Sequence, residues 1–84
     1  MSDQTLLSAI SLLVAGLTIS VGTIGPALGE GRAVAAALDA IARQPEAAST
    51  ISRTLFVGIA MVESTAIYCL VITLIVLFAN PFLS

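Results

Sequence analysis

The sequence has no histidine, a single cysteine and only three basic side chains among its 84 residues. One such chain can build neither a zinc cluster nor a disulfide, and Cys69 is expected to be a small buried hydrophobe. So few basic residues exclude nucleic-acid binding, which needs lysine and arginine to neutralise phosphates. Charged residues make up 10% of the chain, against about 25% in a soluble domain. A chain this short and this apolar must bury its surface in lipid or in copies of itself.

The sequence does contain two long apolar segments, at residues 5–28 and 55–79. Each exceeds the roughly 20 residues with which a helix crosses a bilayer core of about 30 Å. Residues 32–53, between them, hold all three arginines, so the positive-inside rule places this segment in the cytoplasm and both termini on the other side. Residues 1–30 are not expected to be a cleaved signal peptide, because Asp3 stands where such peptides carry basic residues and the apolar run is too long.

The strongest turn signal between the two segments is Pro45. This residue disfavours a helical conformation at Gln44 and loses no hydrogen bond at a helix start, while the flanking Ala-rich stretches are good helix formers. Asn80-Pro81 is expected to stop the last helix. We therefore predict an all-α membrane hairpin, with a first helix over residues 4–42, a cytoplasmic loop over residues 43–46 and a second helix over residues 47–79.

Small residues recur at every second position of the first predicted helix. They are Gly25, Ala27, Gly29, Gly31, Ala33, Ala35 and Ala37. Residues four apart, such as Gly25 and Gly29, form small-xxx-small pairs on a membrane helix. A helix with so little side-chain bulk predicts a tight inner layer of identical helices in a homo-oligomeric ring, and a single dimer interface is the alternative. Pro26 removes a backbone hydrogen bond and predicts a bend in this helix.

Glu63 is the one charged residue between positions 54 and 79. A carboxylate at membrane depth costs roughly 3 kcal/mol or more, and such residues commonly bind ions or relay protons. Further oxygen ligands are expected from the side chains of Ser64, Thr65 and Tyr68 and from the Met61 carbonyl. We interpret this cluster as a site for H⁺ or Na⁺. The alternatives are that Ser64 and Thr65 bond back to the preceding turn and that Tyr68 is an interface aromatic.

Glu30 is a second acid at membrane depth. Counted from the turn at about 1.5 Å per residue, Glu30 and Glu63 differ in height by roughly 6 Å, which two extended side chains can bridge. Two carboxylates in a low-dielectric pocket cannot both be ionised without a counter-ion. The expected filled state is therefore one shared proton plus one monovalent cation, or two protons. Pairing of Glu30 with Arg32 is the alternative, although residues two apart on a helix point apart.

Four segments of the chain together resemble the c-subunits of F-type ATP synthases. They are GPALGEG at residues 25–31, ARQPEA at residues 42–47, ESTAIY at residues 63–68 and FANPF at residues 78–82. The resemblance implies a non-catalytic protein without a cofactor, in a rotor ring of the bacterial inner membrane, that carries H⁺ or Na⁺ on Glu63. It implies the stator a-subunit, the gamma and epsilon subunits of the central stalk and membrane lipid as partners, with the stalk meeting the ring at Arg43, Gln44 and Pro45.

Two positions qualify this resemblance. The Glu-Ser-Thr-x-x-Tyr pattern is similar to the sodium-binding branch of the family, in which the acid of the first helix is commonly glutamine. Glu30 instead resembles the two-carboxylate rings of N-type ATPases, and a second acid favours retained protons. Ala27 stands where many members have glycine, and its methyl group is expected to widen the helix spacing and favour a larger ring.

Other functions fit the sequence less well. A small homo-oligomeric pore former of the holin kind is the main alternative, but it needs neither a buried carboxylate with hydroxyl ligands nor an Arg-Gln-Pro turn. A compact multidrug exporter also carries a lone membrane glutamate, but it needs more spans and aromatic walls. The sequence contains no phosphate-binding loop, so ATP chemistry is expected on another protein.

Overall fold

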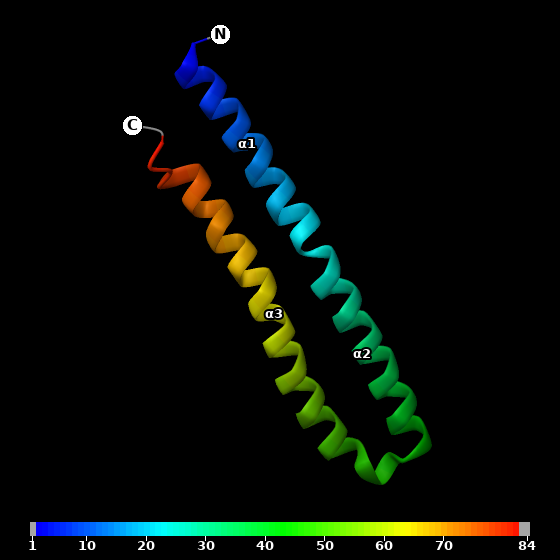
Figure 1. Ribbon diagram of the computed structural model, residues 1–84. Helices are drawn as coiled ribbons and strands as arrows, with labels where there is room; N and C mark the ends of the chain where they lie inside the picture. The colour runs from blue at the N-terminus through cyan, green and yellow to red at the C-terminus, as the bar shows by residue number, and fades with distance from the viewer. Residues whose placement is uncertain (1, 83–84) are drawn as a thin grey trace.

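The computed structural model describes residues 2–82 and shows a hairpin with two long helical arms (Figure 1). The first arm consists of α1 (Asp3–Gly22) and α2 (Ile24–Arg43), and the second arm is α3 (Ala48–Phe78). A short 3₁₀ helix, η1 (Pro45–Ala47), joins the arms. The two described chain ends lie together at one end of the hairpin, and η1 lies at the other. The predicted all-α hairpin of two apolar arms is confirmed.

The first arm is divided at Thr23, three residues before Pro26. Proline has no N–H, so the carbonyl of Gly22 has no backbone donor at position 26. The Thr23 hydroxyl donates to the Ile19 carbonyl at 2.7 Å, and the amide of Ala27 donates to the Thr23 carbonyl at 3.0 Å. The bend expected at Pro26 thus takes the form of a single turn residue just before it.

The connection between the arms is tight. The Gln44 amide donates to the Ala40 carbonyl at 2.8 Å and closes α2, and the Ala47 amide donates to the Gln44 carbonyl at 2.9 Å within the next turn. Pro45 occupies the start of η1, where its missing N–H costs nothing. Because η1 takes residues 45–47, the α-helical part of the second arm begins at Ala48.

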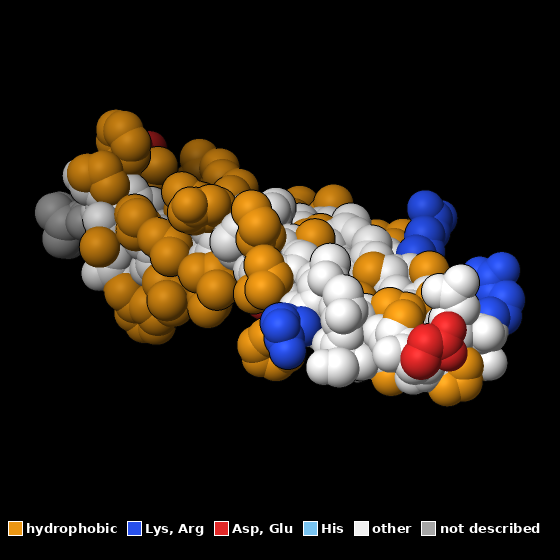
Figure 2. Space-filling view, turned by 90° about the horizontal axis from the view of Figure 1, so that it is seen from below, with side chains coloured by type: hydrophobic (Ala, Val, Ile, Leu, Met, Phe, Trp, Pro, Cys, Tyr) orange, Lys and Arg blue, Asp and Glu red, His pale blue; other side chains and the backbone are white. Residues whose placement is uncertain are grey.

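Few side chains are buried within a single chain. Among residues 2–82, the buried ones are Ala15, Ala37 and Thr73, whereas Phe56 is 79% exposed and Leu12 is 65% exposed. Helical segments Asp3–Arg43 and Pro45–Phe78 are each long and apolar enough to cross a membrane. Hydrophobic side chains gather towards the end with the termini, and charged and small polar groups gather towards the loop (Figure 2). The exposed apolar side chains of the hairpin must therefore be covered by surrounding molecules.

The hairpin is also longer than a membrane is thick. Its extents are 64 × 17 × 9 Å, and a bilayer core measures only about 30 Å. The hairpin as a whole is therefore too long to lie within a bilayer core, and its apolar side chains lie towards the termini.

The contacts between the two arms include one close approach and one polar pair. A Cβ atom added at Gly22 would lie 2.6 Å from Cys69 Sγ, so the half-buried Cys69 packs directly against the α1 backbone. Asn80 Nδ2 donates to Ser11 Oγ at 3.1 Å, while Asn80 Oδ1 accepts from the Phe82 amide at 2.9 Å. Asn80 therefore follows the end of α3 and also ties the second arm to α1.

Gly22→Ala is expected to destabilise the full chain in detergent, by about 1–3 kcal/mol relative to its control, because the new methyl group overlaps Cys69 Sγ. Thermal unfolding followed by far-UV circular dichroism measures this change. Gly58→Ala is the matched control, because a Cβ there meets nothing within 4 Å. In a Cys69→Ala background the cost should fall by about 1 kcal/mol; an unchanged cost would contradict the contact.

Candidate functional site

Two acids from different arms approach each other, Glu30 just beyond the first apolar segment and Glu63 within the second. The carboxyl groups of Glu30 in α2 and Glu63 in α3 lie close enough for the charge of one to affect the other. Glu30 is half-buried and Glu63 is exposed. The predicted proximity of the two acids is therefore present within a single chain.

The helical phase explains why Glu30 faces the other arm. Glu30 follows Gly22 by eight residues and precedes Ala37 by seven, and residues at these spacings share one face of a helix. Gly22 contacts Cys69 of α3, and Ala37 is buried. Glu30 thus lies on the covered face of the first arm.

One oxygen of this acidic pair has no partner among residues 2–82. Glu30 Oε1 is buried and accepts no hydrogen bond from any described group. A buried acceptor without a donor costs about 1–3 kcal/mol. A proton or a cation at this oxygen would offset that cost, so the pair has the chemistry of a cation site.

The oxygen ligands predicted on α3 fall into two groups. Ser64 Oγ donates to the Met61 carbonyl at 2.5 Å, so the back-bond considered for Ser64 is formed and places this hydroxyl beside that carbonyl. Thr65 and Tyr68 are exposed on α3, and the Tyr68 side chain is 70% exposed. Within one chain Ser64 and Met61 are thus brought together, and Thr65 and Tyr68 face outward.

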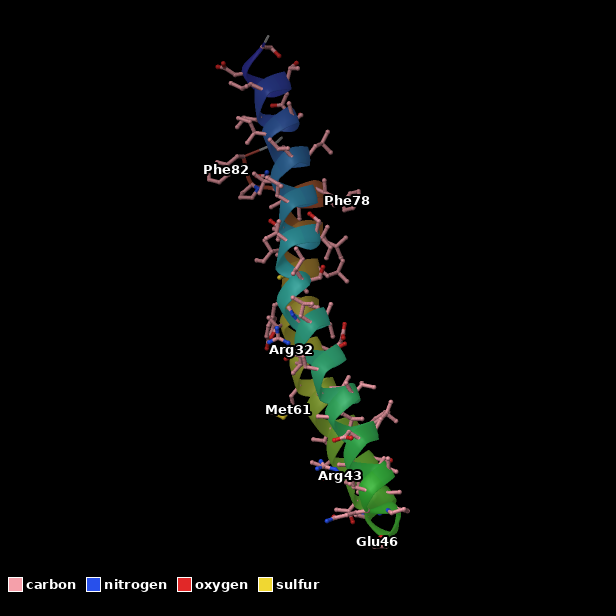
Figure 3. The ribbon with its side chains drawn as sticks, turned by 90° about the vertical axis from the view of Figure 1, so that its right-hand side faces the viewer. Arg32, Arg43, Glu46, Met61, Phe78 and Phe82 are labelled. Atoms are coloured by element: carbon pink, nitrogen blue, oxygen red, sulfur yellow. The ribbon has the colours of Figure 1, made fainter. Side chains whose placement is uncertain are left out.

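The hairpin has two chemically different edges. Met61 and Glu63 are two residues apart, which is about 200° around α3, so their side chains leave the helix in nearly opposite directions. The labelled side chains of Met61 and Arg32 project to the same side of the hairpin (Figure 3). One edge therefore carries Glu63, and the other carries Met61 and Arg32.

The small residues predicted to pack the ring lie on free surface of α2. A Cβ atom at Gly25, Gly29 or Gly31 would meet nothing within 4 Å, and Ala27 is exposed. These residues contrast with Gly22, whose Cβ position is taken by Cys69. Gly25, Ala27, Gly29 and Gly31 are thus available to a neighbouring molecule rather than used within the hairpin.

Two of the loop residues predicted to contact a stalk, Arg43 and Gln44, line a shallow hollow. Arg43 ends α2, Gln44 has extended backbone angles (φ −134°, ψ 73°) and Pro45 begins η1. A pocket of about 300 Å³ is lined by Ala40, Arg43 and Gln44. This part of the chain therefore presents a cation and an amide beside an open depression.

Two polar contacts show which side-chain pairs can be predicted from the sequence and which cannot. Among residues 2–82 the one ion pair joins Arg43 to Asp39 at 3.1 Å, so the alternative pairing of Glu30 with Arg32 is not formed. The Asp39–Arg43 ion pair was not predicted, although residues of opposite charge four apart on a helix favour such a pair. The hydrogen bond between Asn80 and Ser11 joins residues 69 positions apart, and no local sequence pattern predicts it.

Comparison with known proteins gives consistent matches over most of the chain. Residues 13–76 match the family of ATP synthase C-subunits. A protein of Cereibacter sphaeroides named ATP synthase subunit c 2 is 71% identical over 72 residues, which cover 86% of this chain and 87% of that protein. Proteins named as ATP synthase c-subunits from a Synechococcus species and from Prochlorococcus marinus are 52% identical over 77 residues and 50% identical over 79 residues. These two alignments cover 92% and 94% of this chain, and 95% and 98% of the relatives.

Gly29→Leu is expected to leave the hairpin intact and to weaken self-association of the full chain roughly tenfold, a loss of about 1.4 kcal/mol. The position is open within one chain, but a bulky side chain there prevents close helix approach. The fraction of oligomer in mild detergent measures the effect, and circular dichroism checks the hairpin. Leu28→Met on the same helix is the control without added bulk, and undiminished association of the Gly29 variant would contradict the assignment.

Proposed function

The chain belongs to the ATP synthase C-subunit family, and we propose that it carries the coupling cation of the rotor ring on Glu63, with Glu30 as the partner acid. Proteins of this family form the rotor ring of the ATP synthase and lie in the membrane, in keeping with the two apolar arms. The observation that supports the cargo role is the interaction between the carboxyl groups of Glu30 and Glu63. The role proposed for this chain is ion carriage rather than catalysis.

The proposed cargo is a monovalent cation, H⁺ or Na⁺, held by oxygen atoms. Glu30 Oε1 offers a buried acceptor, and the closeness of the two acids allows them to share one proton. The Met61 carbonyl and the Ser64 hydroxyl form a second group of oxygens, to which Thr65 and Tyr68 add. The filled state is one shared proton plus one cation, or two protons, because two bare carboxylates repel each other in lipid.

A second copy of the chain is proposed to complete the site. Glu63 is exposed in a single hairpin, and a charge exposed to lipid is costly. Because the Glu63 edge and the edge with Met61 and Arg32 differ, copies associate through unlike edges, and such contacts generate a closed ring when the rotation closes. The first arm is proposed to lie on the tight inside of this ring and α3 on the outside, and the open glycines of α2 support this arrangement.

The proposed cycle uses Glu63 as the exchange point with the stator a-subunit. A cation enters through a half-channel, occupies the site and travels with the ring until a cation of the stator competes for Glu63. One charge crossing 100 mV yields about 2.3 kcal/mol, so several copies must act for each ATP. Torque is transmitted to the gamma and epsilon subunits of the central stalk through Arg43, Gln44 and Pro45.

The proposed location is the bacterial inner membrane, with the loop in the cytoplasm and both termini in the periplasm. The three arginines lie on the loop side of the apolar segments, which supports this orientation. The pore-former alternative is not favoured, because the family match covers both arms and the positions of both acids.

Glu63→Gln is expected to abolish both carbodiimide labelling of assembled rings and ATP-driven cation transport in reconstituted vesicles, because the amide neither reacts nor exchanges a cation. Mass spectrometry of the ring measures labelling, and a vesicle flux assay measures transport. Glu30→Gln is the matched control and should remain labelled at Glu63. Undiminished transport by the Glu63 variant would contradict the proposal.

The identity of the cargo is tested by labelling wild-type rings across pH with and without sodium. If Na⁺ is the cargo, sodium should slow labelling, and Ser64→Ala should weaken this protection about tenfold through loss of one ligand. If H⁺ is the cargo, the rate of labelling should depend on pH and should not change when sodium is added. Ser52→Ala, a serine elsewhere on α3, is the control for a general effect of losing a hydroxyl.

A further inference from the structure

Arg32 lies near the height of the acid pair but forms no ion pair within the hairpin. It follows Glu30 by two residues, so it stands about 3 Å closer to the loop along the helix axis. Its side chain is exposed. Among residues 2–82 the one ion pair joins Arg43 to Asp39. An unpaired guanidinium so close to the apolar segments is costly, and a negative partner would offset that cost.

Within one hairpin, Arg32 points away from both acids. Residues two apart on a helix differ by about 200° around its axis, so the side chains of Arg32 and Glu30 leave α2 in nearly opposite directions. The same spacing separates Met61 from Glu63 on α3. Arg32 and Met61 project to the same side of the hairpin (Figure 3). A single copy therefore presents a guanidinium at the edge opposite to the one that carries Glu63.

In the proposed ring, these unlike edges meet at matching heights. Copies related by rotation about the ring axis are not displaced along it, so a given residue has the same height in every copy. Because Glu63 and Glu30 of one hairpin approach each other, Arg32 of one copy faces the exposed Glu63 of the next with a small offset towards the loop. A long, flexible arginine side chain can span such an offset.

Three of the five acids in the sequence lie too far along the helices to serve as this partner. Asp3 precedes Arg32 by 29 residues, which is about 44 Å of helix, and Glu46 lies beyond the end of α2. Asp39 stands about 10 Å closer to the loop and already forms an ion pair. Glu63 of the next copy, by contrast, has both a suitable height and an exposed side chain.

We infer that Arg32 of one copy pairs with Glu63 of the next and that its fixed positive charge weakens cargo binding there, an inference that rests on the proposed function. Two acids that share one proton keep one negative charge, for which the guanidinium and the cargo cation compete. A guanidinium is always charged in a protein, so it lowers the affinity for the cargo without being carried itself. A site with two carboxylates can then release its cation to the stator.

The contact is tested by treating assembled rings with a membrane-permeant carbodiimide, which joins a carboxyl group to an adjacent amine. The sequence contains no lysine, so Arg32→Lys introduces the one side-chain amine and keeps the charge. This variant should form covalent oligomers in denaturing gels, and mass spectrometry should find position 32 of one copy joined to Glu63 of another. Arg53→Lys on α3 is the matched control and should give no product at Glu63, because ten residues separate the two positions, about 15 Å of helix.

The effect on cargo binding is tested by the rate at which carbodiimide labels Glu63 at fixed pH. Where sodium protects, Arg32→Gln should lower the concentration that halves labelling about tenfold, which corresponds to about 1.4 kcal/mol. Where sodium has no effect, Arg32→Gln should raise the rate of labelling about tenfold, because the protonated acid is the reactive form. A merely structural role of Arg32 would weaken cation binding instead. Arg53→Gln removes the same charge elsewhere and should behave like wild type.

An unchanged or weaker cation affinity in Arg32→Gln would overturn the inference. So would the absence of a joined product in Arg32→Lys rings whose Glu63 still reacts with carbodiimide, the result expected if a lipid headgroup pairs with Arg32. Should Arg32→Gln fail to assemble, the joined product in Arg32→Lys still decides the contact. A lack of labelling at Glu63 in wild-type rings would contradict the proposed function itself, and the inference with it.

Discussion

The cost of a carboxylate in lipid is the constraint on which the rest of this structure depends. Glu63 lies in a stretch of α3 with no other charge, and Glu30 approaches it from the other arm, so the two acids can share a proton or a cation. The hairpin brings the two acids together. Gly22 allows the arms to come close at Cys69, and Glu30 lies on the same face of the first arm as Gly22. The exposed side of Glu63 is left to a neighbour, so the same constraint accounts for an oligomer.

Much of the fold follows from the sequence, because its signals are local and physically strong. Two apolar segments joined at Pro45 predict the hairpin, and the resemblance to the c-subunits of F-type ATP synthases is confirmed by the family match. The approach of Glu30 to Glu63 was predicted from height alone, counted from the turn. The roles of Met61, Ser64, Thr65 and Tyr68 as ligands and the choice between H⁺ and Na⁺ stay predictions, because no contact within a single hairpin tests them.

Other features of the structure had no local signal. The break at Thr23 depends on the hydrogen bonds that the Thr23 hydroxyl and the Ala27 amide make around Pro26. Sequence spacing does not predict at which residue of this turn the break occurs. Asn80 reads as a helix stop, yet its bond to Ser11 depends on the relative length of two arms. The two unlike edges emerge only when α2 and α3 are placed in a common frame, because the residues that define them lie on separate helices.

The unlike edges have a genetic consequence. Every copy in the proposed ring lends part of its surface to the cation site of the next, so a defective chain damages two sites rather than one. All copies must also pass the stator in turn during each revolution. A cell that expresses a mixture of normal and Glu63-deficient chains would therefore lose far more activity than the fraction of altered protein, and such an allele would behave as dominant.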